Sequence, residues 1–576
     1  MAGDFFQLMI SPLKRYQTTM LMKRLFLIFL TLMGLSGQLL ADVKLQQQGT
    51  ATQLVVNGQP MLILGGELSN SAATSIADID SVLPRMARLG LNTIFVPACW
   101  DLMEPEEGKF DFSLIDETIK VARENRLKIV LLWFGAWKNS MSCYTPLWFK
   151  CDSKRFPRAT TANGKPLEIA SAFSEDVFQA DNKAFGRLMQ HIAEIDRKEN
   201  TVVMMQIENE IGMLEAARDH SPLAEKAWRQ PVPQKLLTAL KINKKGTWPE
   251  VFGTDLYAEE KFQAYHYASY VERLARTARS IHDIPLYVNA AMNSRGRKPG
   301  EYPSAGPLAH LITIWKCAAP SIDIYAPDIY DKGYKNWVAQ YKRPDNPFFT
   351  PEVRLDRNSG VRALYTFGEA DAIAYSPFAI DQAPEEVSGE ITRTYDLLRR
   401  LTPTLLSHQG GKRAAPNNWG LLFDRQDKER VIEDGEVTLT CRHYFTLPWD
   451  ARATDGSEWP EGGGLIVKLA KNEYLIAGNG LVVVFQSKTE KLQETKVVRG
   501  EDGFVDNGNS RNGVSIQQKP FTGKRVGIGH VDQVTFDEAG HMKFLRRDNG
   551  DQDHQGRHAR ISCGEYKMLH VKLYEY

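Results

Sequence analysis

The sequence predicts an α/β fold, a (β/α)₈ TIM barrel followed by an all-β, sandwich-like C-terminal domain. Short apolar runs alternate with amphipathic stretches over about 350 residues, which is typical of strands and helices that alternate around a parallel barrel. From about residue 415 the pattern changes to short alternating runs separated by Gly, Asp and Asn, as in a β-sandwich. The chain of 576 residues is also longer than one hydrophobic core usually accommodates, so at least two domains are expected.

The barrel is expected within residues 42–395. Eight apolar runs have the length and composition of strands, near residues 61–68, 91–97, 127–135, 201–208, 285–290, 322–327, 347–352 and 371–376. Apolar residues at helical spacing predict helices between them, for instance at 76–90, 113–126 and 260–282. A doubly wound sheet is the main alternative. It normally has a glycine-rich phosphate loop after its first strand, and "GGELSNS" does not fit that pattern.

The N-terminus, residues 1–41, is expected to be an upstream segment and a secretory signal peptide. Lys23 and Arg24 precede an apolar run that ends at Ala41, where cleavage is expected. The run is short and interrupted by glycine, so no stable membrane span is expected after cleavage, and an uncleaved anchor is the alternative. The protein is therefore expected to be exported, as a periplasmic or secreted bacterial protein. Residues 396–414 are expected to form a helix end and linker, and residues 415–576 a β-rich accessory domain.

The charge balance excludes several classes of partner and site. Lys plus Arg number 71 and Asp plus Glu 70, a net charge of +1, which gives no indication of nucleic acid or an anionic surface as partner. The six cysteines form no CxxC pair and the histidines have no partners at ligand spacing, so neither a metal nor a cofactor is expected. Cys143 and Cys151 could form a disulfide or remain buried thiols, and the sequence leaves this open.

Carboxylates at two predicted strand ends indicate the chemistry. The active residues of a parallel barrel lie at the C-terminal ends of its strands. The fourth predicted strand ends in Glu208, Asn209 and Glu210, and the seventh ends in Glu352. Glycoside hydrolysis requires one protonated carboxyl for the leaving oxygen and one ionised carboxylate for the anomeric carbon. The Asn209 amide can hold a sugar hydroxyl. Solvated glutamates at strand ends are the simpler alternative.

The segment "QIENEIG" (206–212) resembles the acid/base motif of glycoside hydrolase family 35, the β-galactosidases. "LGLNTIFVPACWDLMEPEEGKFDFSLID" (89–116) and "GGEL" also resemble that family, most closely a bacterial branch with a β domain after the barrel. The resemblance covers most of residues 55–380. It implies that Glu210 is the proton donor, that Glu352 is the nucleophile, and that Asn209 and Glu208 contact the sugar. It also implies net retention, with the two carboxyl groups roughly 5–5.5 Å apart.

Two segments depart from the family pattern and weaken the prediction of galactose specificity. Ile211 stands where the family has an aromatic residue, and the third-strand end, "WFGAWKNSMSCYTPLWFK", differs from the family's galactose-binding segment. The third-strand end of this chain is similar to some degree to that of the related family 42 galactosidases. Further candidates for contacts with the sugar, with packing or loop support as the alternative for each, are Trp100, Glu104, Trp137, Asn139, Tyr330 and Tyr375.

The favoured function is that of an exported retaining exo-β-glycosidase, a β-galactosidase acting on terminal β-galactosides of oligo- or polysaccharides. Its partner would be a carbohydrate. A glucanase- or mannanase-like enzyme on the same barrel is one alternative, and a non-catalytic carbohydrate-binding protein is another. The stretch 213–260 is longer than most loops and is expected to shape the pocket rim or form an oligomer contact, so a homo-oligomer is compatible with the sequence.

Overall fold

The computed structural model describes residues 42–293, 295–411, 416–447, 450–493, 521–537, 539–549 and 558–576. The predicted leader, residues 1–41, and part of the predicted linker lie outside these ranges. Within them, no helix has both the length and the apolar character needed to cross a membrane.

Eight parallel strands form the barrel, and all eight predicted strands are present. They are β4 (Ile63–Leu64), β5 (Thr93–Cys99), β6 (Lys128–Phe134), β9 (Val202–Gln206), β10 (Leu286–Ala291), β11 (Ile324–Ile329), β12 (Thr350–Val353) and β13 (Ala374–Pro377). They are hydrogen-bonded in the order β4-β13-β12-β11-β10-β9-β6-β5. The ring closes where Phe95 N donates to Gly66 O (3.0 Å) and Leu68 N donates to Phe95 O (3.0 Å). The predicted fold class is confirmed.

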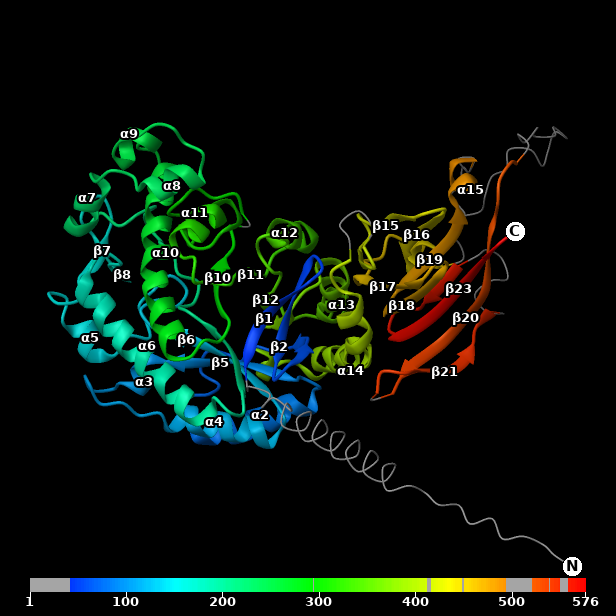
Figure 1. Cartoon of the computed structure of the whole chain (residues 1–576), viewed down its shortest axis with the longest axis horizontal. Coiled ribbons are helices and arrows are strands. Elements are labelled where there is room, and N and C mark those ends of the chain that lie inside the picture. The colour runs from blue at the N-terminus through cyan, green and yellow to red at the C-terminus, as the bar shows by residue number, and fades with distance from the viewer. Residues whose placement is uncertain are drawn as a thin grey trace, which may run out of the picture.

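Helices pack around the outside of this barrel (Figure 1). They are α2 (Ile76–Arg88), α4 (Ser113–Glu124), α6 (Glu175–Asp196), α10 (Leu256–Ile281), α11 (Ile312–Ala318), α12 (Tyr334–Tyr341), α13 (Ser359–Ala370) and α14 (Glu385–His408). Polar side chains begin three of them, because Ser75, Ser174 and Asp255 each accept a hydrogen bond from a backbone N–H of the first turn. The alternation of strand and helix therefore follows signals that are local in the sequence.

The long stretch after the fourth strand folds into three short helices. These are α7 (Pro222–Trp228), α8 (Gln234–Ala239) and α9 (Trp248–Phe252), which gather near α10 and α11 in Figure 1. The rings of Trp228 and Trp248 pack edge-on against Phe262 of α10, with centroids 5.0 and 5.2 Å away. The stretch is thus an ordered part of the barrel's outer layer, anchored by aromatic contacts.

The C-terminal part consists of two antiparallel sheets. The six-stranded sheet contains β14 (Asn418–Phe423), β17 (Gly462–Ala470), β18 (Glu473–Asn479), β23 (Lys567–Glu575), β20 (Val526–Phe536) and β21 (Met542–Arg547). The four-stranded sheet contains β15 (Glu429–Asp434), β16 (Val437–His443), β19 (Leu481–Ser487) and β22 (His558–Ile561). Buried side chains from both sheets share one hydrophobic cluster, so the accessory domain is a sandwich.

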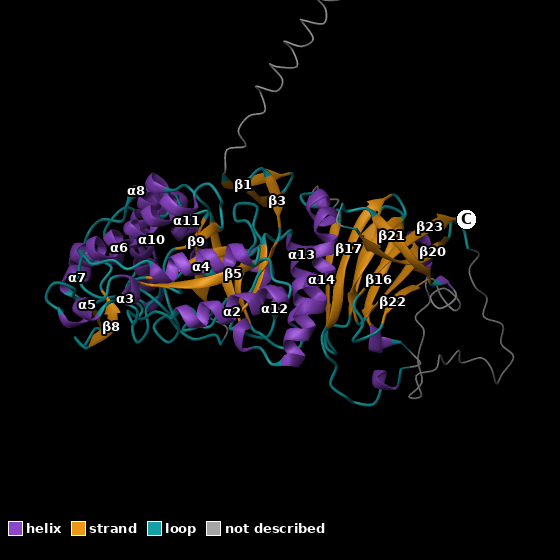
Figure 2. Cartoon of the chain, turned by 90° about the horizontal axis from the view of Figure 1, so that it is seen from below, coloured by secondary structure: helices purple, strands orange, loops and turns teal. Residues whose placement is uncertain are grey.

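Helices α13 and α14 lie between the barrel and the β sheets (Figure 2). The backbones approach closely there, because a Cβ on Gly420 would lie 2.4 Å from Tyr365 O of α13. Arg362 of α13 also forms two hydrogen bonds with Glu461, which precedes β17, at 2.7 and 2.9 Å. The two domains are therefore joined by close packing and by paired charges.

Candidate active site

The end of the fourth strand makes an irregular turn beside the end of the third. Glu208 and Glu210 have φ of 58° and 46°, and Asn139 and Ser140 have φ of 51° and 60°. Each such left-handed non-glycine residue costs about 1–3 kcal/mol and clusters of them occur at functional sites. Backbone hydrogen bonds hold the two segments together, from Asn139 N to Asn209 O (3.2 Å) and from Ser140 N to Glu210 O (3.1 Å). The turn directs neighbouring side chains in different directions.

Glu352, at the end of β12, has a carboxyl group that receives three hydrogen bonds. Its Oε1 accepts from Asn209 Nδ2 (3.2 Å) and from Asn289 Nδ2 (3.3 Å). Its Oε2 accepts from the hydroxyl of Tyr330 at 2.5 Å. The residue is only 3% exposed. These three donors hold both oxygens of the carboxyl in place, and a nucleophile requires such a fixed position.

Glu210 lies opposite, in surroundings that favour the protonated form. It is 6% exposed, and burial, followed by the negative charge of Glu352, raises its pKa to about 7. Its Oε2 accepts a hydrogen bond from Asn139 Nδ2. One carboxylate oxygen from each of Glu210, Glu352 and Asp328 lies within 4.8 Å of the other two. The two predicted carboxyls therefore meet at short range, one suited to be an acid and one suited to be a nucleophile.

Asn289 and Asp328 complete this arrangement, and the sequence analysis did not select either. Asn289 Oδ1 accepts from Glu210 N (2.9 Å), while its Nδ2 donates to Asp328 Oδ2 (2.7 Å). Burial, and then the charges of Glu352 and Glu210, raise the pKa of Asp328 well above its usual range, and its carboxyl hydrogen-bonds to that of Glu210. The available signal was a single polar residue near the end of an otherwise apolar strand.

Lys138 and Glu67 reach the same site from the third and first strands. Lys138 is buried, and its Nζ donates to Asn209 Oδ1 at 3.0 Å. Glu67 is fully buried at the end of the first strand. Burial, and then the charge of Glu352, raise the pKa of Glu67 well above its usual range, and Lys138 opposes this shift. Glu67 lies within the "GGEL" segment that contributed to the family resemblance, but the segment alone gave it no role.

Glu208 points away from the pair formed by Glu210 and Glu352. Its Oε2 accepts from Trp137 N at 2.7 Å, and its carboxyl hydrogen-bonds to that of Asp181. Asp181 in turn accepts from Trp133 Nε1 (2.9 Å) and from the Tyr270 hydroxyl (2.7 Å). Burial raises the pKa of both carboxyls. Glu208, which was expected to contact the sugar, instead anchors the turn from behind.

The remaining predicted residues divide into two groups. Asn139 and Tyr330 hydrogen-bond to the two carboxyls and are exposed or half-buried, so they mark the solvent side of the site. Trp137 contributes backbone atoms, and its buried ring packs edge-on against Tyr267 and Tyr270.

Trp100, Glu104 and Tyr375 form their contacts elsewhere. Trp100 Nε1 donates to Glu104 Oε2 (2.8 Å), and Glu104 also accepts from Gly108 N (2.7 Å), so this pair fixes a loop. Tyr375 is fully buried, and the groups whose charges influence its pKa include Tyr334 and Arg362 of the outer helices. Of the two predicted tyrosines, Tyr330 therefore hydrogen-bonds to Glu352 and Tyr375 packs among the outer helices.

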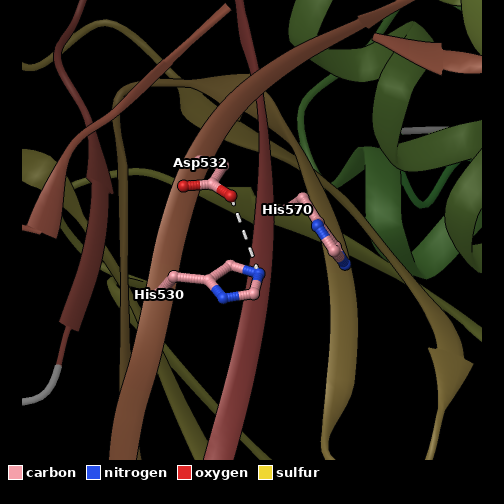
Figure 3. Close-up of side chains that lie close together, drawn as sticks. All are labelled: His530, Asp532 and His570. Atoms are coloured by element: carbon pink, nitrogen blue, oxygen red, sulfur yellow. Dashed lines mark ion pairs between the residues drawn. The ribbon is translucent and has the colours of Figure 1, made fainter. Parts of the chain in front are cut away.

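Two clusters of the described residues have side chains of the types that hold metal ions. The first is Glu210, Asp328 and Glu352, whose oxygens suit a hard cation, but hydrogen-bond donors already surround them. The second is His530, Asp532 and His570, on strands β20 and β23 of the six-stranded sheet (Figure 3). There Arg547 forms two hydrogen bonds with Asp532, at 2.7 and 3.0 Å, and His570 Nε2 lies 2.8 Å from Glu473 Oε1.

The six cysteines are all free, so Cys143 and Cys151 are not joined by a disulfide. The alternative of two buried thiols is not met either, because Cys143 is half-buried and Cys151 is exposed. Cys143 Sγ lies 3.8 Å from Lys138 O, and the Cys151 side chain is exposed.

Comparisons with known proteins identify part of the barrel. A family model described as Beta-galactosidase, of glycoside hydrolase family 42, matches residues 74–259, and one described as a domain of unknown function (DUF5597) matches residues 391–560. Human Beta-galactosidase-1-like protein 3 is 25% identical over 212 residues, which cover 34% of this chain and 30% of that protein.

Solved β-galactosidase structures show a weaker likeness. That of Bacillus circulans sp. alkalophilus has a TM-score of 0.45 and 15% identity, and covers 60% of this chain and 57% of its own. That of Halorubrum lacusprofundi has a TM-score of 0.44 and 17% identity, with 58% of both chains covered. The chain thus spans less than two thirds of the length of each of these proteins.

The family match refines the assignment made from motifs. Residues 74–259 match the model of glycoside hydrolase family 42, whereas the motifs resemble family 35. The matched range includes Glu210 and ends before Glu352. The role of Glu352 therefore depends on its geometry in this structure.

Proposed function

We propose that the protein is an exported retaining exo-β-galactosidase that removes terminal β-galactosyl groups from oligo- or polysaccharides. The observation that carries this proposal is the pair formed by Glu210 and Glu352, of which one oxygen each lies within 4.8 Å of the other. Three donors hold the carboxyl of Glu352, while burial and the charge of Glu352 raise the pKa of Glu210 to about 7. Carboxyl groups about 5–5.5 Å apart are typical of retaining glycosidases, while inverting enzymes need about 6.5–9.5 Å for a water molecule.

The geometry supports a double displacement. Glu352 attacks the anomeric carbon while Glu210 protonates the departing oxygen, which gives a glycosyl–enzyme ester and the free aglycone. Glu210, now ionised, then removes a proton from water as the water attacks the same carbon, and Glu352 leaves. Asn209 and Tyr330 hold Glu352 in position for both steps through hydrogen bonds to its two oxygens.

The finer parts of the proposal have separate support. Galactose as the sugar is supported by the family model that covers Glu210 and by the relatives' descriptions. Exo action is supported by the burial of both carboxyls, because a buried site suits a chain end better than a chain interior. Export is supported by the leader-like pattern of residues 1–41.

The test compares two variants on aryl β-galactosides of different leaving-group quality. We expect Glu352→Gln to lower kcat/KM by at least about a thousandfold on every substrate, because no other group can form the ester. Glu210→Gln should lower it by about 10²–10⁴-fold on poor leaving groups and much less on nitrophenyl substrates, which need no acid. NMR of the first-formed sugar should show the β anomer.

Several outcomes would contradict the proposal. An α anomer as first product would exclude a retaining mechanism. Full activity of Glu352→Gln would show that Glu352 is not the nucleophile. Hydrolysis of the β-glucoside or β-mannoside alone would indicate the glucanase- or mannanase-like alternative. Sugar binding without turnover of any glycoside would indicate a carbohydrate-binding protein.

A further inference from the structure

Glu67 occupies a rigid position at the end of the first barrel strand. Its N donates to Pro377 O at 2.9 Å, and its O accepts from Ile380 N at 3.1 Å. The two preceding glycines are tightly packed, since a Cβ on Gly65 would lie 2.7 Å from the Phe95 ring, and one on Gly66 would lie 2.7 Å from Leu91. Glu67 is therefore the first residue after β4 that brings a polar side chain to the barrel rim, and the backbone that carries it is fixed.

The carboxyl group of Glu67 has no hydrogen-bond partner of ordinary geometry among the described residues. The residue is 0% exposed, and no N–H or O–H donor of the described residues lies within hydrogen-bond distance of its side-chain oxygens, so a proton shared with the carboxyl of Glu352 is its one interaction of this kind. Burying a polar group without a partner is unfavourable, and proteins usually satisfy such groups. The position thus carries an energetic cost that the folded chain alone does not offset.

The charged groups around Glu67 place it inside the proposed catalytic centre. The charges of Glu352, Lys138 and Glu210, from the largest effect to the smallest, shift the pKa of Glu67. Its carboxyl also comes near enough to that of Glu352 to share a proton. The scissile bond must lie between Glu210 and Glu352 for both to act on it. A sugar ring held there would bring its hydroxyl groups to Glu67.

We infer that Glu67 is a substrate-binding residue that holds a hydroxyl group of the sugar being released. A carboxyl that keeps its proton both donates and accepts, which matches a sugar hydroxyl. Among the described residues, the four carboxyls of Glu67, Glu210, Asp328 and Glu352 lie close together, and the ammonium group of Lys138 acts on those of Glu67 and Glu210. The sugar is therefore uncharged, and a uronic acid is refused because its carboxylate would add a further negative charge. This inference rests on the proposed function.

The experiment measures kcat/KM of the full chain on nitrophenyl β-galactoside and its 2-, 3-, 4- and 6-deoxy analogues. Glu67→Ala should lower kcat/KM on the parent by about 10–100-fold. On the analogue that lacks the hydroxyl held by Glu67, the same substitution should cost less than about threefold. Glu67→Gln, whose amide also donates and accepts, should stay within about fivefold of the wild type. Glu106→Ala is the matched control, because Glu106 is an exposed loop carboxyl.

The outcomes separate this inference from the function on which it rests. If the wild type hydrolyses none of the glycosides, the proposed function fails and the inference falls with it. If the wild type is active but Glu67→Ala affects all five substrates equally, or none, Glu67 does not bind the sugar and the function stands. Should the alanine variant not fold, Glu67→Met, which keeps the length and removes both oxygens, replaces it. Equal rates on the galactoside and its uronide would overturn the charge argument.

Discussion

The barrel rim and the six-stranded sheet of the β domain each carry a cluster of acidic residues, but the two clusters differ in charge balance and in the exposure of the basic partners. Asp532 is as buried as Glu210, at 6% exposed, whereas its partner Arg547 is 56% exposed and Lys138 only 2%. In the β domain, Asp532 pairs with Arg547 and Glu473 lies beside His570, and the basic partners are partly exposed. At the rim, four carboxyls are nearly fully buried around Lys138. Acids matched by bases at a surface need no explanation beyond solubility and weak pairing.

The rim cluster buries more acidic than basic side chains, and folding alone does not require such an arrangement. Acids that outnumber bases in a buried site must take up protons, and the pKa values of Glu67, Glu210 and Asp328 are all raised by burial first. One of these, that of Glu210, is raised only to about 7, where it can both give and accept a proton near neutral pH. The difference between the clusters therefore separates a chemical site from a charged surface.

Of the substitutions that test this comparison, the largest effect is expected from removing Asp328, the member of the rim cluster that has no chemical role of its own. Asp328→Ala takes away the hydrogen bond to Glu210 and leaves Asn289 Nδ2 without its 2.7 Å partner. We expect kcat on an aryl β-galactoside to fall by about 100-fold, because Glu210 is no longer held in position. Steady-state kinetics at matched thermal stability would measure this, and an unchanged kcat would show that the cluster works without Asp328.

The second effect is the pH dependence of the wild type. Glu210 must be protonated to act as an acid, so activity should fall as pH rises through its pKa of about 7, tenfold for each further unit. On substrates with poor leaving groups, kcat/KM measured between about pH 5 and pH 9 should show this basic limb. The limb should be missing in Glu210→Gln. A limb that persists in that variant would assign the titration to another rim carboxyl.

The sequence predicted the parts of this site that have local signals. The eight strands follow from apolar runs between helical stretches, and Glu210 and Glu352 follow because each ends such a strand. Glu67, Asn289 and Asp328 were missed because each is one polar residue whose partners are far away in sequence, as Asn289 and Glu210 are 79 residues apart. Glu208 was misplaced because its positive φ turns the side chain toward Asp181, which no local pattern indicates.

The smallest effect is expected in the β domain, where Asp532→Asn is the counterpart of the Asp328 substitution. The hydrogen bonds from Arg547 hold the pKa of Asp532 below its usual range, so the pair stabilises the fold when the carboxyl is ionised. Arg547 is 56% exposed, so solvent screens the pair and the free energy of unfolding should decrease by only about 0.2–1 kcal/mol. Urea unfolding would measure this, with the difference shrinking in about 1 M salt. Hydrolytic activity should not change, because the substitution leaves the barrel rim intact, and a loss of activity at unchanged stability would show that the two acidic clusters are functionally linked.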